Sequence, residues 1–269
     1  MKTIPQADPS IGAFRLSSEE RAELAAIGYV VRRDVFGADE LARISDACEA
    51  LVADLVRDRQ GHRLRAGSYV FDPDLTRLVI MKWEGDSDVL HGIEPFAHLH
   101  DELRAWALDP RFVEPMCDLV GSDTTELFTE KLNLKRPRHG GVNPLHQDYP
   151  YWVDVADDPA EVATAMLFLD DATHDNGCLY VVPGSHRSGV WNRRTDGDPF
   201  LGNEIDTAQY PDAGEIPIEA RAGTVVMFGS YLVHRSDPNR SDAPRRAILF
   251  SYQPPGRPHM LESLRKLRR

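Results

Sequence analysis

The segment 143–152, NPLHQDYPYW, holds a histidine and a carboxylate separated by one residue. In an extended segment, residues two positions apart point to the same side, so His146 and Asp148 can converge while Gln147 points away. Two such groups belong to the 2-His-1-carboxylate triad, which holds non-haem Fe(II) and leaves coordination positions open. A His-x-Asp pair also occurs by chance, so two polar side chains in an aromatic-rich loop remain the alternative.

A third ligand can come from a later segment, GSYLVHRSDPNRSDAPRRAILFSYQ (229–253). His234 ends an apolar run there, although a lone histidine at a strand end is more often structural. Arg245 begins the next expected strand, and we expect an antiparallel hairpin that places Arg245 beside His234. A guanidinium can clamp a carboxylate through two parallel hydrogen bonds. A metal with open positions beside such a clamp indicates an enzyme with an acidic co-substrate.

The order of these residues, together with DNGCLYVVPGSH (175–186) and PRRA (244–247), resembles the phytanoyl-CoA dioxygenase family of Fe(II)/2-oxoglutarate-dependent oxygenases. The N-terminal segment IGYVVRRDVFGADELARI (27–44) also resembles the opening helix, strand and helix of that family. The resemblance therefore extends over nearly the whole chain. It implies a double-stranded β-helix core, a cupin-like jelly roll, with helices packed on its outer face.

The resemblance also implies roles for individual residues. Its iron ligands match His146, Asp148 and His234. Its contacts to 2-oxoglutarate match four positions, of which Thr164 is equally well explained as an ordinary strand residue: Arg245 at the distal carboxylate, the hydroxyl of Ser236, Asn133 and Thr164. With Fe(II), 2-oxoglutarate as co-substrate and O2, such an enzyme releases succinate and CO2 and hydroxylates an unactivated C–H bond. A carboxylate at Asp148 fills the position that a halide would need, which favours oxygenation over halogenation.

Aromatic residues and a long loop are the candidates for contacting the substrate. Tyr149, Tyr151 and Trp152 follow the His-x-Asp pair, and they either pack in the core or line a pocket, with Trp152 the first choice for the pocket. The connection 187–214 is long enough to act as a lid. Its Trp191, Arg193 and Arg194 are lid candidates, and the two arginines either pair with an anionic substrate group or are simply solvated.

The elements that must position these residues change in character along the chain. Helical patterns occupy about 1–123, with a capping box at Ser17 and Glu20 and further helices in 39–55, 101–108 and 110–121, and one strand in 29–36. From about 124 to 256, short apolar runs alternate with Gly, Pro, Asn and Asp, as in strands of an antiparallel jelly roll. We therefore predict a single domain, 1–269, that is mainly β and is buttressed by N-terminal helices.

Composition limits the class of protein and its partners. The chain has 269 residues and a formal net charge of −12, which argues against nucleic acid as a partner. Cys48, Cys117 and Cys178 are too few and too far apart for a disulfide framework, which favours a reducing, cytoplasmic location. No apolar run approaches the length of a membrane span, so we expect a protein without membrane partners. The sequence does not indicate an oligomeric state.

The preferred function is hydroxylation of a small-molecule metabolite with an amino acid-like or natural-product scaffold. One alternative is an acyl-CoA hydroxylase of the same family, although the acidic composition offers no evident basic groove for the nucleotide. Another alternative is a metal-dependent β-sandwich without redox chemistry, acting as an enzyme or a binding protein. Arg245 distinguishes an oxygenase from the metal-dependent protein without redox chemistry, because only an acidic co-substrate requires this arginine.

Overall fold

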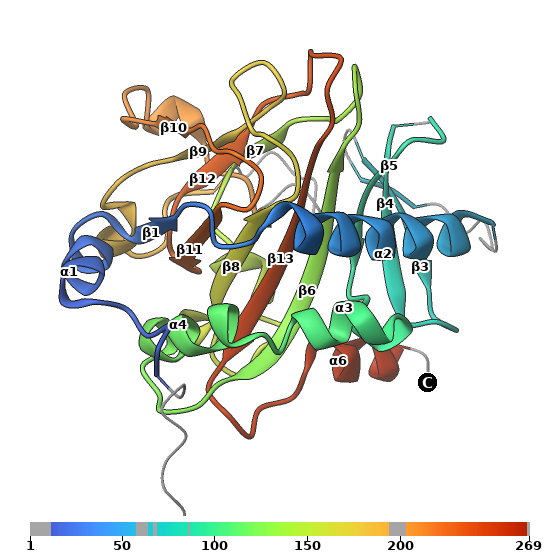
Figure 1. Ribbon diagram of the computed structural model, residues 1–269. Coiled ribbons are helices and arrows are strands. Elements are labelled where there is room, and N and C mark those ends of the chain that lie inside the picture. Colours follow the sequence, from blue (N-terminus) through green and yellow to red (C-terminus); the bar gives the residue numbers. More distant parts are fainter. Residues whose placement is uncertain (1–11, 58–63, 67–68, 86, 194–202, 268–269) are drawn as a thin grey trace, which may run out of the picture.

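The computed structural model describes residues 12–57, 64–66, 69–85, 87–193 and 203–267, which hold two antiparallel sheets facing each other (Figure 1). Among these residues the larger sheet has nine strands, in the order β1-β11-β8-β13-β6-β5-β4-β3-β2. Its strands are β1 (Tyr29–Arg32), β2 (Leu64–Ala66), β3 (Tyr69–Asp74), β4 (Val79–Glu84), β5 (Leu90–Glu94), β6 (Glu126–Lys135), β8 (Ala163–Phe168), β11 (Val225–Gly229) and β13 (Arg245–Gln253).

The smaller sheet has four strands in the described part of the chain, in the order β10-β9-β12-β7. They are β7 (Asn143–His146), β9 (Leu179–Val181), β10 (Ile216–Ile218) and β12 (His234–Ser236). Apolar side chains from both sheets meet in the space between them, for example Phe168 and Phe228 with Val181. Two facing antiparallel sheets of short strands around one apolar interior form the jelly roll that the sequence predicts.

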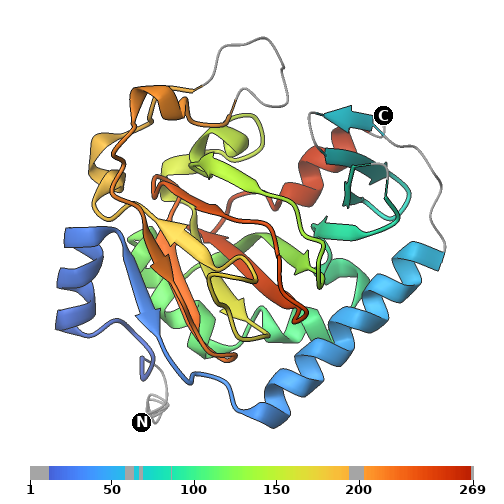
Figure 2. The same cartoon turned by 90° about the horizontal axis from the view of Figure 1, so that it is seen from above.

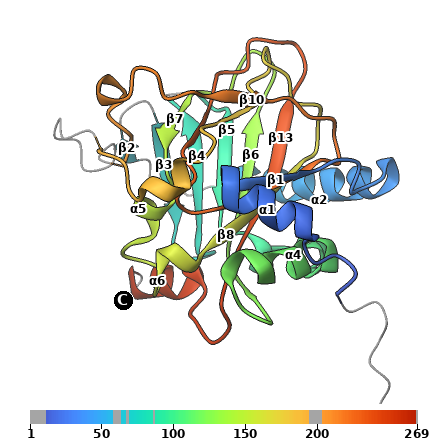
Figure 3. The same cartoon turned by 90° about the vertical axis from the view of Figure 1, so that its left-hand side faces the viewer.

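Helices cover the outer face of the larger sheet. The helices α2 (Ala38–Arg57), α3 (Asp101–Trp106) and α4 (Pro110–Val120) lie across it (Figures 1 and 2), and their apolar residues belong to the largest core cluster. The helix α1 (Ser18–Ile27) begins with the predicted capping box between Ser17 and Glu20. The helices α5 (Tyr149–Trp152) and α6 (Met260–Leu267) lie together at another side (Figure 3). Short 3-10 turns are η1 (Ala97–Leu99), η2 (Pro159–Glu161), η3 (Ser185–Ser188) and η4 (Thr207–Gln209). None of the described helices is both long and apolar enough to span a membrane.

Residues 64–94 correct the prediction of a helical N-terminal part. They form β2 to β5, which extend the larger sheet beyond β6. In β4 the burial alternates along the strand, with Met81 and Trp83 in the core. Alternation of this kind is the pattern of a half-buried strand, and it is visible in the segment VIMKWE. The helical part, about 1–123, therefore also contributes strands to the sheet that carries the core.

The predicted hairpin between β12 and β13 is wrong. β12 pairs with β7 and β9 in the smaller sheet, whereas β13 pairs with β6 and β8 in the larger sheet. The connection 237–244 carries the chain from one sheet to the other. Arg245 lies two positions before Ala247, whose side chain packs between the sheets, so Arg245 shares that interior face. It approaches the ligand segment from the opposite sheet.

Candidate active site

The three predicted iron ligands come together on the interior face of the smaller sheet. His234 lies directly opposite His146 in the register of β12 and β7, and the ring centroids are 4.1 Å apart. Asp148 follows β7, and its Oδ1 lies 3.7 Å from Nε2 of His146 and 3.9 Å from Nε2 of His234. One ligand atom from each residue lies within 4.8 Å of the others. Antiparallel pairing thus joins two distant segments into one ligand set.

The two histidine rings are fixed by carbonyl groups two residues earlier. Nδ1 of His146 donates to the oxygen of Pro144 at 2.6 Å, and Nδ1 of His234 donates to the oxygen of Leu232 at 2.9 Å. In a neutral imidazole the other nitrogen then carries a lone pair, and in both rings this is the Nε2 that faces Asp148. Burial keeps the pKa of His146 well below its ordinary value, and the neighbouring His234 adds to this. Two neutral imidazoles and one carboxylate fit Fe(II).

Arg245 supplies a buried positive charge from the larger sheet. Its side chain is 1% exposed, and its Nε and Nη2 donate to the oxygen of Gly177 at 3.0 and 2.7 Å. Burial lowers the pKa of Arg245 to about 10, so the guanidinium remains charged at neutral pH. Its Nη1 has no hydrogen-bond partner among the described residues. A buried donor without an acceptor costs about 1–3 kcal/mol, and a carboxylate of a ligand would remove that cost.

A chain of polar contacts joins the two sheets beside the ligand set. Nδ2 of Asn143 donates to Oγ of Ser236 at 3.2 Å, and Oδ1 of Asn143 accepts from Nζ of Lys82 at 3.5 Å. Burial and the charge of Lys131 lower the pKa of Lys82 to about 7. Ser236 therefore faces the interior, and its contact to 2-oxoglutarate stays a prediction. Sequence analysis missed Lys82 and Asn143, because the strand that carries Lys82 was not predicted.

His91 lies next to these polar contacts. Its buried ring is expected to make the stability of the folded protein depend on pH. Its ring lies 3.3 Å from both Oε1 of Glu84 and Oδ1 of Asn143, and burial lowers its pKa to about 4. In the unfolded chain the pKa lies near 6.5, so between pH 4 and 6.5 the unfolded state binds more protons and stability falls as the pH falls.

Between pH 6.5 and 4, we expect the free energy of unfolding of the native protein to fall by up to about 3 kcal/mol more than that of His91→Gln. Urea unfolding at several pH values measures this difference. The variant serves as the control for the carboxyl groups that titrate in the same range. Equal pH dependence of the two proteins would show that the pKa of His91 is the same in the folded and unfolded states, which contradicts its lowering by burial.

Asn133 lies on the interior face near Arg245. It pairs with Ala247 of β13 and with Gly92 of β5. A Cβ at Gly92 would lie 3.1 Å from the oxygen of Leu132 and 3.7 Å from Oδ1 of Asn133, so glycine keeps the space beside the amide open. The position suits a contact with a small ligand held by Arg245. The predicted contact to 2-oxoglutarate stays a prediction.

Thr164 is placed differently. Its Oγ1 lies 2.8 Å from Oγ of Ser251, so the hydroxyl already has a partner within the larger sheet. Ser251 is six residues after Arg245 on β13, which separates the Cα atoms by roughly 20 Å. The geometry therefore favours the alternative of an ordinary strand residue, and it argues against a co-substrate contact shared by Thr164 and Arg245.

Two of the three aromatic residues after the His-x-Asp pair are engaged in packing. The ring of Trp152 meets that of Phe128 edge-on at 5.5 Å, in a buried cluster with Val162. The ring of Tyr149 stacks on Tyr231 at 4.7 Å. Trp152, the first choice for the pocket wall, thus takes the core-packing alternative.

Of these three aromatic residues, Tyr151 lies beside the ligand set, where the buried Phe228 also meets the His234 ring at 5.1 Å. The ring of Tyr151 meets the His146 ring edge-on at 5.7 Å, and 43% of its surface is exposed. The surrounding protein raises the pKa of Tyr151, and the carboxylates of Glu204 and Asp148 raise it further. Tyr151 therefore carries the predicted pocket role best, as a proposal.

The first part of the long loop, residues 189–191, is hydrogen-bonded to the residue between His146 and Asp148. Gln147, which is 1% exposed, points away from the ligand set as predicted. Its Nε2 donates to the oxygens of Gly189 and Tyr231 at 2.8 and 2.7 Å, and its Oε1 accepts from the backbone N–H of Trp191 at 2.9 Å. The residue between two metal ligands therefore anchors residues 189–191.

Replacing Gln147 with leucine is expected to destabilise the protein by about 2–4 kcal/mol, because three partly buried backbone groups lose their partner. We also expect faster proteolytic cleavage within the loop, with the iron content retained at saturating iron. Urea unfolding and limited proteolysis measure these effects. The matched control is Gln209→Ala, an exposed glutamine of the same loop. Equal stability of Gln147→Leu and native protein would contradict the anchoring role.

The last part of the loop, residues 203–205, pairs with the edge of the smaller sheet. Glu204 forms an isolated antiparallel bridge with His146, and the N–H of Ile205 donates to the oxygen of Leu145 at 2.8 Å. The described parts of the loop are thus hydrogen-bonded to the sheet that carries the ligands, and there they form a wall. Residues 194–202 of the predicted lid, Arg194 among them, lie outside the described residues.

Arg193 closes the base of the loop. Its Nη1 donates to Oδ1 of Asn203 at 2.8 Å, and its backbone bridges to Ile205. The side chain is exposed. The solvated alternative thus explains Arg193, and its predicted contact with a substrate stays without support here.

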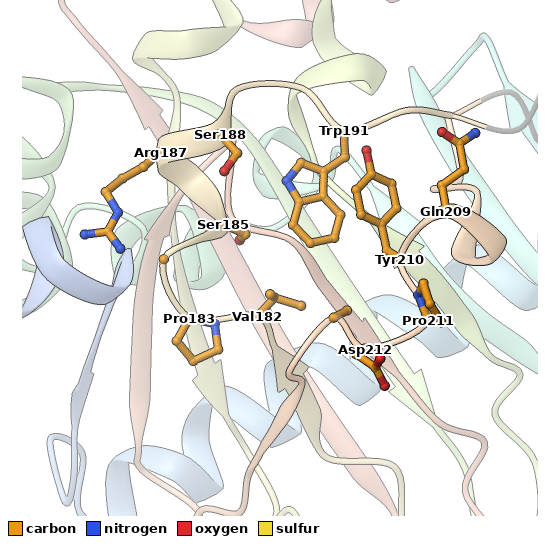
Figure 4. Close-up of a pocket in the computed structure, with 12 residues that line it drawn as sticks. Val182, Pro183, Ser185, Arg187, Ser188, Trp191, Gln209, Tyr210, Pro211 and Asp212 are labelled. Carbon is orange, nitrogen blue, oxygen red and sulfur yellow. The ribbon is translucent and has the colours of Figure 1, made fainter.

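A groove of about 440 Å³ lies behind the ligand sheet (Figure 4). Its walls include Val182, Tyr210 and Trp191, whose ring stacks on Tyr210 at 4.1 Å. Val182 belongs to the apolar cluster of Leu145, and Trp191 and Tyr210 pack against that cluster. Leu145 directly precedes His146 in β7, so the cluster lies on the opposite face of the sheet. The groove is therefore separate from the candidate active site.

Solved structures share the fold of this chain. An EctD from S. alaskensis with bound Fe has a TM-score of 0.68 and 24% identity, covering 88% of this chain and 76% of that one. SnoK, a non-haem alpha-ketoglutarate-dependent carbocyclase from nogalamycin biosynthesis, has a TM-score of 0.69 and 22% identity, covering 91% and 86%. The predicted jelly-roll fold with flanking helices is confirmed.

Curated relatives include a methylphosphonate hydroxylase of Gimesia maris, 31% identical over 47% of this chain and 44% of that protein. Another is a probable alpha-ketoglutarate-dependent hypophosphite dioxygenase of Stutzerimonas stutzeri, 25% identical over 87% of this chain and 78% of that protein. The chain spans less than half the length of the first relatives it matches. The profile of the phytanoyl-CoA dioxygenase (PhyH) family matches residues 25–247. The chain therefore belongs to the phytanoyl-CoA dioxygenase family.

Proposed function

We propose that this protein is an Fe(II)- and 2-oxoglutarate-dependent dioxygenase that hydroxylates an unactivated C–H bond of a small-molecule metabolite. The observation that carries the proposal is the pairing of the His146, Asp148 and His234 set with a buried arginine on the facing sheet, whose Nη1 has no hydrogen-bond partner among the described residues. An acidic co-substrate is the ligand that uses both features.

Each residue has a defined task in this reaction. When bound, the iron supplies the oxidising chemistry with O2 and 2-oxoglutarate. His146, Asp148 and His234 hold the metal and leave one side of it open. Arg245 binds the distal carboxylate of the co-substrate, and Ser236 donates its hydroxyl beside it. Tyr151 stands at the ligand set, where it helps to exclude water from the reacting centre.

The substrate class that we propose is an amino acid-like or natural-product scaffold. The relatives support a small substrate, since they include a 2-aminoethylphosphonate dioxygenase, 28% identical over 60% of this chain, and the methylphosphonate hydroxylase. The net charge of −12 also disfavours a polyanionic nucleotide carrier.

An anaerobic titration tests the reaction type. Fe(II) and 2-oxoglutarate are added to the folded protein without oxygen, and the visible charge-transfer band of the chelated metal is recorded. We expect the band in the native protein and its loss in Arg245→Gln at the same 2-oxoglutarate concentration. Iron-loaded, folded native protein without the band would support the non-redox β-sandwich instead. Succinate release with a metabolite panel then identifies substrates.

A further inference from the structure

Lys131 points from the larger sheet into the space between the two sheets. It lies on β6 opposite Leu249 of β13, which packs against the apolar cluster between the sheets, and two positions before Asn133 on the same face. β6 lies between β13 and β5 within its sheet (Figure 1). Even so, 39% of the Lys131 side chain is exposed. Water therefore reaches the space between the sheets at this lysine.

Two carboxylates keep the ammonium group of Lys131 charged. Its Nζ lies 3.1 Å from Oε2 of Glu94, the one carboxylate within ion-pair distance of it in the described part of the chain. Oε1 of Glu94 accepts a hydrogen bond from Oγ1 of Thr129 at 3.1 Å, which fixes the carboxylate. Burial opposes the charged form, but the charges of Glu94 and Asp148 outweigh it and raise the pKa of Lys131 above its ordinary value. Because an ammonium group has three N–H donors, Lys131 can hold Glu94 and still bind a further anion.

Lys131 reaches the ligand set away from the predicted anchor of the co-substrate. Arg245 lies opposite Lys135 in the register of β13 and β6, four residues along β6 from Lys131, which is roughly 14 Å. The charge of Lys131 instead acts on Asp148, and it adds to the lowering of the pKa of His146, which burial dominates. A ligand held by Lys131 can therefore lie beside the metal ligands while Arg245 holds 2-oxoglutarate.

A second lysine faces the same space. Lys82 lies opposite Gly92 of β5, and Gly92 lies opposite Asn133 of β6. Gly92 has no side chain, so the space between Lys82 and Asn133 stays open. Burial and then the positive charge of Lys131 lower the pKa of Lys82 to about 7, so the two lysines repel each other. An anion bound beside both would relieve this repulsion. Nζ of Lys82 is already hydrogen-bonded to Asn143, and Lys131 is therefore the residue assigned to the anion.

We propose that Lys131 is a specificity-determining residue that binds an anionic head group of the substrate, a carboxylate or a phosphonate, in the open space beside Gly92. The inference rests on the proposed oxygenase function and narrows its substrate class. A hydrogen bond between charged partners is roughly twice as strong as a neutral one, so it can fix the orientation of a small substrate. The C–H bonds close to the head group are then the ones presented to the metal ligands.

Two other roles for Lys131 predict different results. If Lys131 only neutralised Glu94, Lys131→Gln and Glu94→Gln would both destabilise the free protein, and neither would change a preference for anions. If Lys131 contacted 2-oxoglutarate, Lys131→Gln would weaken binding of 2-oxoglutarate, as Arg245→Gln is expected to do. If it binds the substrate, the affinity for 2-oxoglutarate stays unchanged. Glu94→Gln then keeps or gains affinity for the anion, because a competing carboxylate is gone.

The test uses the anaerobic complex of the full chain with Fe(II) and 2-oxoglutarate. The probes are small aliphatic anions, namely propanoate, 3-aminopropanoate and ethylphosphonate, each beside its neutral amide or ester. Calorimetry and the shift of the visible band measure probe binding, and a titration of the band measures the affinity for 2-oxoglutarate. Thermal unfolding verifies that each variant is folded. The variants are Lys131→Gln, the charge-retaining Lys131→Arg and Glu94→Gln, and the matched control is Lys266→Gln, an exposed lysine of α6.

We expect the native complex to bind at least one anionic probe more tightly than its neutral analogue, and Lys131→Gln to lose about 10- to 100-fold in affinity for that probe. Lys131→Arg should retain part of the affinity, and Glu94→Gln and Lys266→Gln all of it. The proposal would be overturned by a native complex without preference for any anionic probe, by an undiminished preference in Lys131→Gln, by an equal loss in Glu94→Gln, or by weakened 2-oxoglutarate binding in Lys131→Gln. Absence of the visible band in folded, iron-loaded native protein would instead count against the oxygenase function.

Discussion

Asp148→Ala is expected to lose at least about 10³-fold in turnover, because residues that act as a unit in a reaction cost this much when one is removed. Asp148 Oδ1 is the single carboxylate oxygen within 4 Å of both Nε2 atoms among the described residues. Without it, His146 and His234 remain as a two-nitrogen site that holds iron weakly. Their rings keep their direction, since Pro144 and Leu232 fix them independently of the carboxylate.

Metal analysis after dialysis and succinate release measure this effect. The control is His174→Ala, which removes an exposed histidine that pairs with Asp175. We expect its iron content and turnover to equal those of the native protein. Full iron content with native turnover in Asp148→Ala would show that the ligand set is not the reaction centre.

Arg245→Gln is expected to raise the apparent KM for 2-oxoglutarate by about 10²- to 10³-fold, since loss of one partner of a buried charge pair costs 2–5 kcal/mol. The glutamine can still bond to Gly177, whose oxygen accepts two hydrogen bonds from Arg245. The Nη1 of Arg245 has no hydrogen-bond partner among the described residues. Removal of this buried positive charge should therefore leave the protein folded in the absence of 2-oxoglutarate. The effect then appears in ligand binding.

Thermal unfolding with and without 2-oxoglutarate separates binding from folding. A ligand that binds only the folded state stabilises it by RT ln(1 + [L]/Kd), so at one concentration a tighter ligand raises the melting temperature more. We expect this rise in the native protein with iron, and little of it in Arg245→Gln. Arg246→Gln is a demanding control, because Arg246 is the next residue and pairs with Asp170 on the other face of β13. An equal rise in native protein and Arg245→Gln would contradict the role of Arg245.

Much of the fold could be predicted from local patterns. The capping box at Ser17, the amphipathic α2 and the apolar runs of β6, β8, β11 and β13 are all signals that lie within one segment. The strands β2 to β5 were missed because their alternation is short and follows a strongly helical segment. The pairing of β12 with β7, rather than β13, was missed because strand partners depend on tertiary packing and not on distance along the chain.

The ligand set could be predicted because two residues at fixed spacing and an ordered family pattern identify it. Lys82 and Glu204 could not, since each reaches the interior through a strand partner far away in sequence. Glu204 follows a loop with no periodic pattern, and only its bridge to His146 shows which way it points. The roles of Trp152 and Thr164 depended on direction and on available hydrogen-bond partners, which spacing alone does not specify.

The hydrogen bonds of Gln147 bear on how the long loop can vary in proteins with this architecture. One carboxamide joins the catalytic segment to the start of the loop at Gly189 and Trp191, and it contacts only backbone atoms there. Backbone donors and acceptors are the same for every amino acid except proline, which lacks the N–H that Trp191 donates, so the joint tolerates any other loop sequence. Loops of different length and side-chain content can be exchanged beyond residue 191 while the metal-binding strand keeps its place. The joint thus separates the long loop from the segment that holds two of the proposed metal ligands.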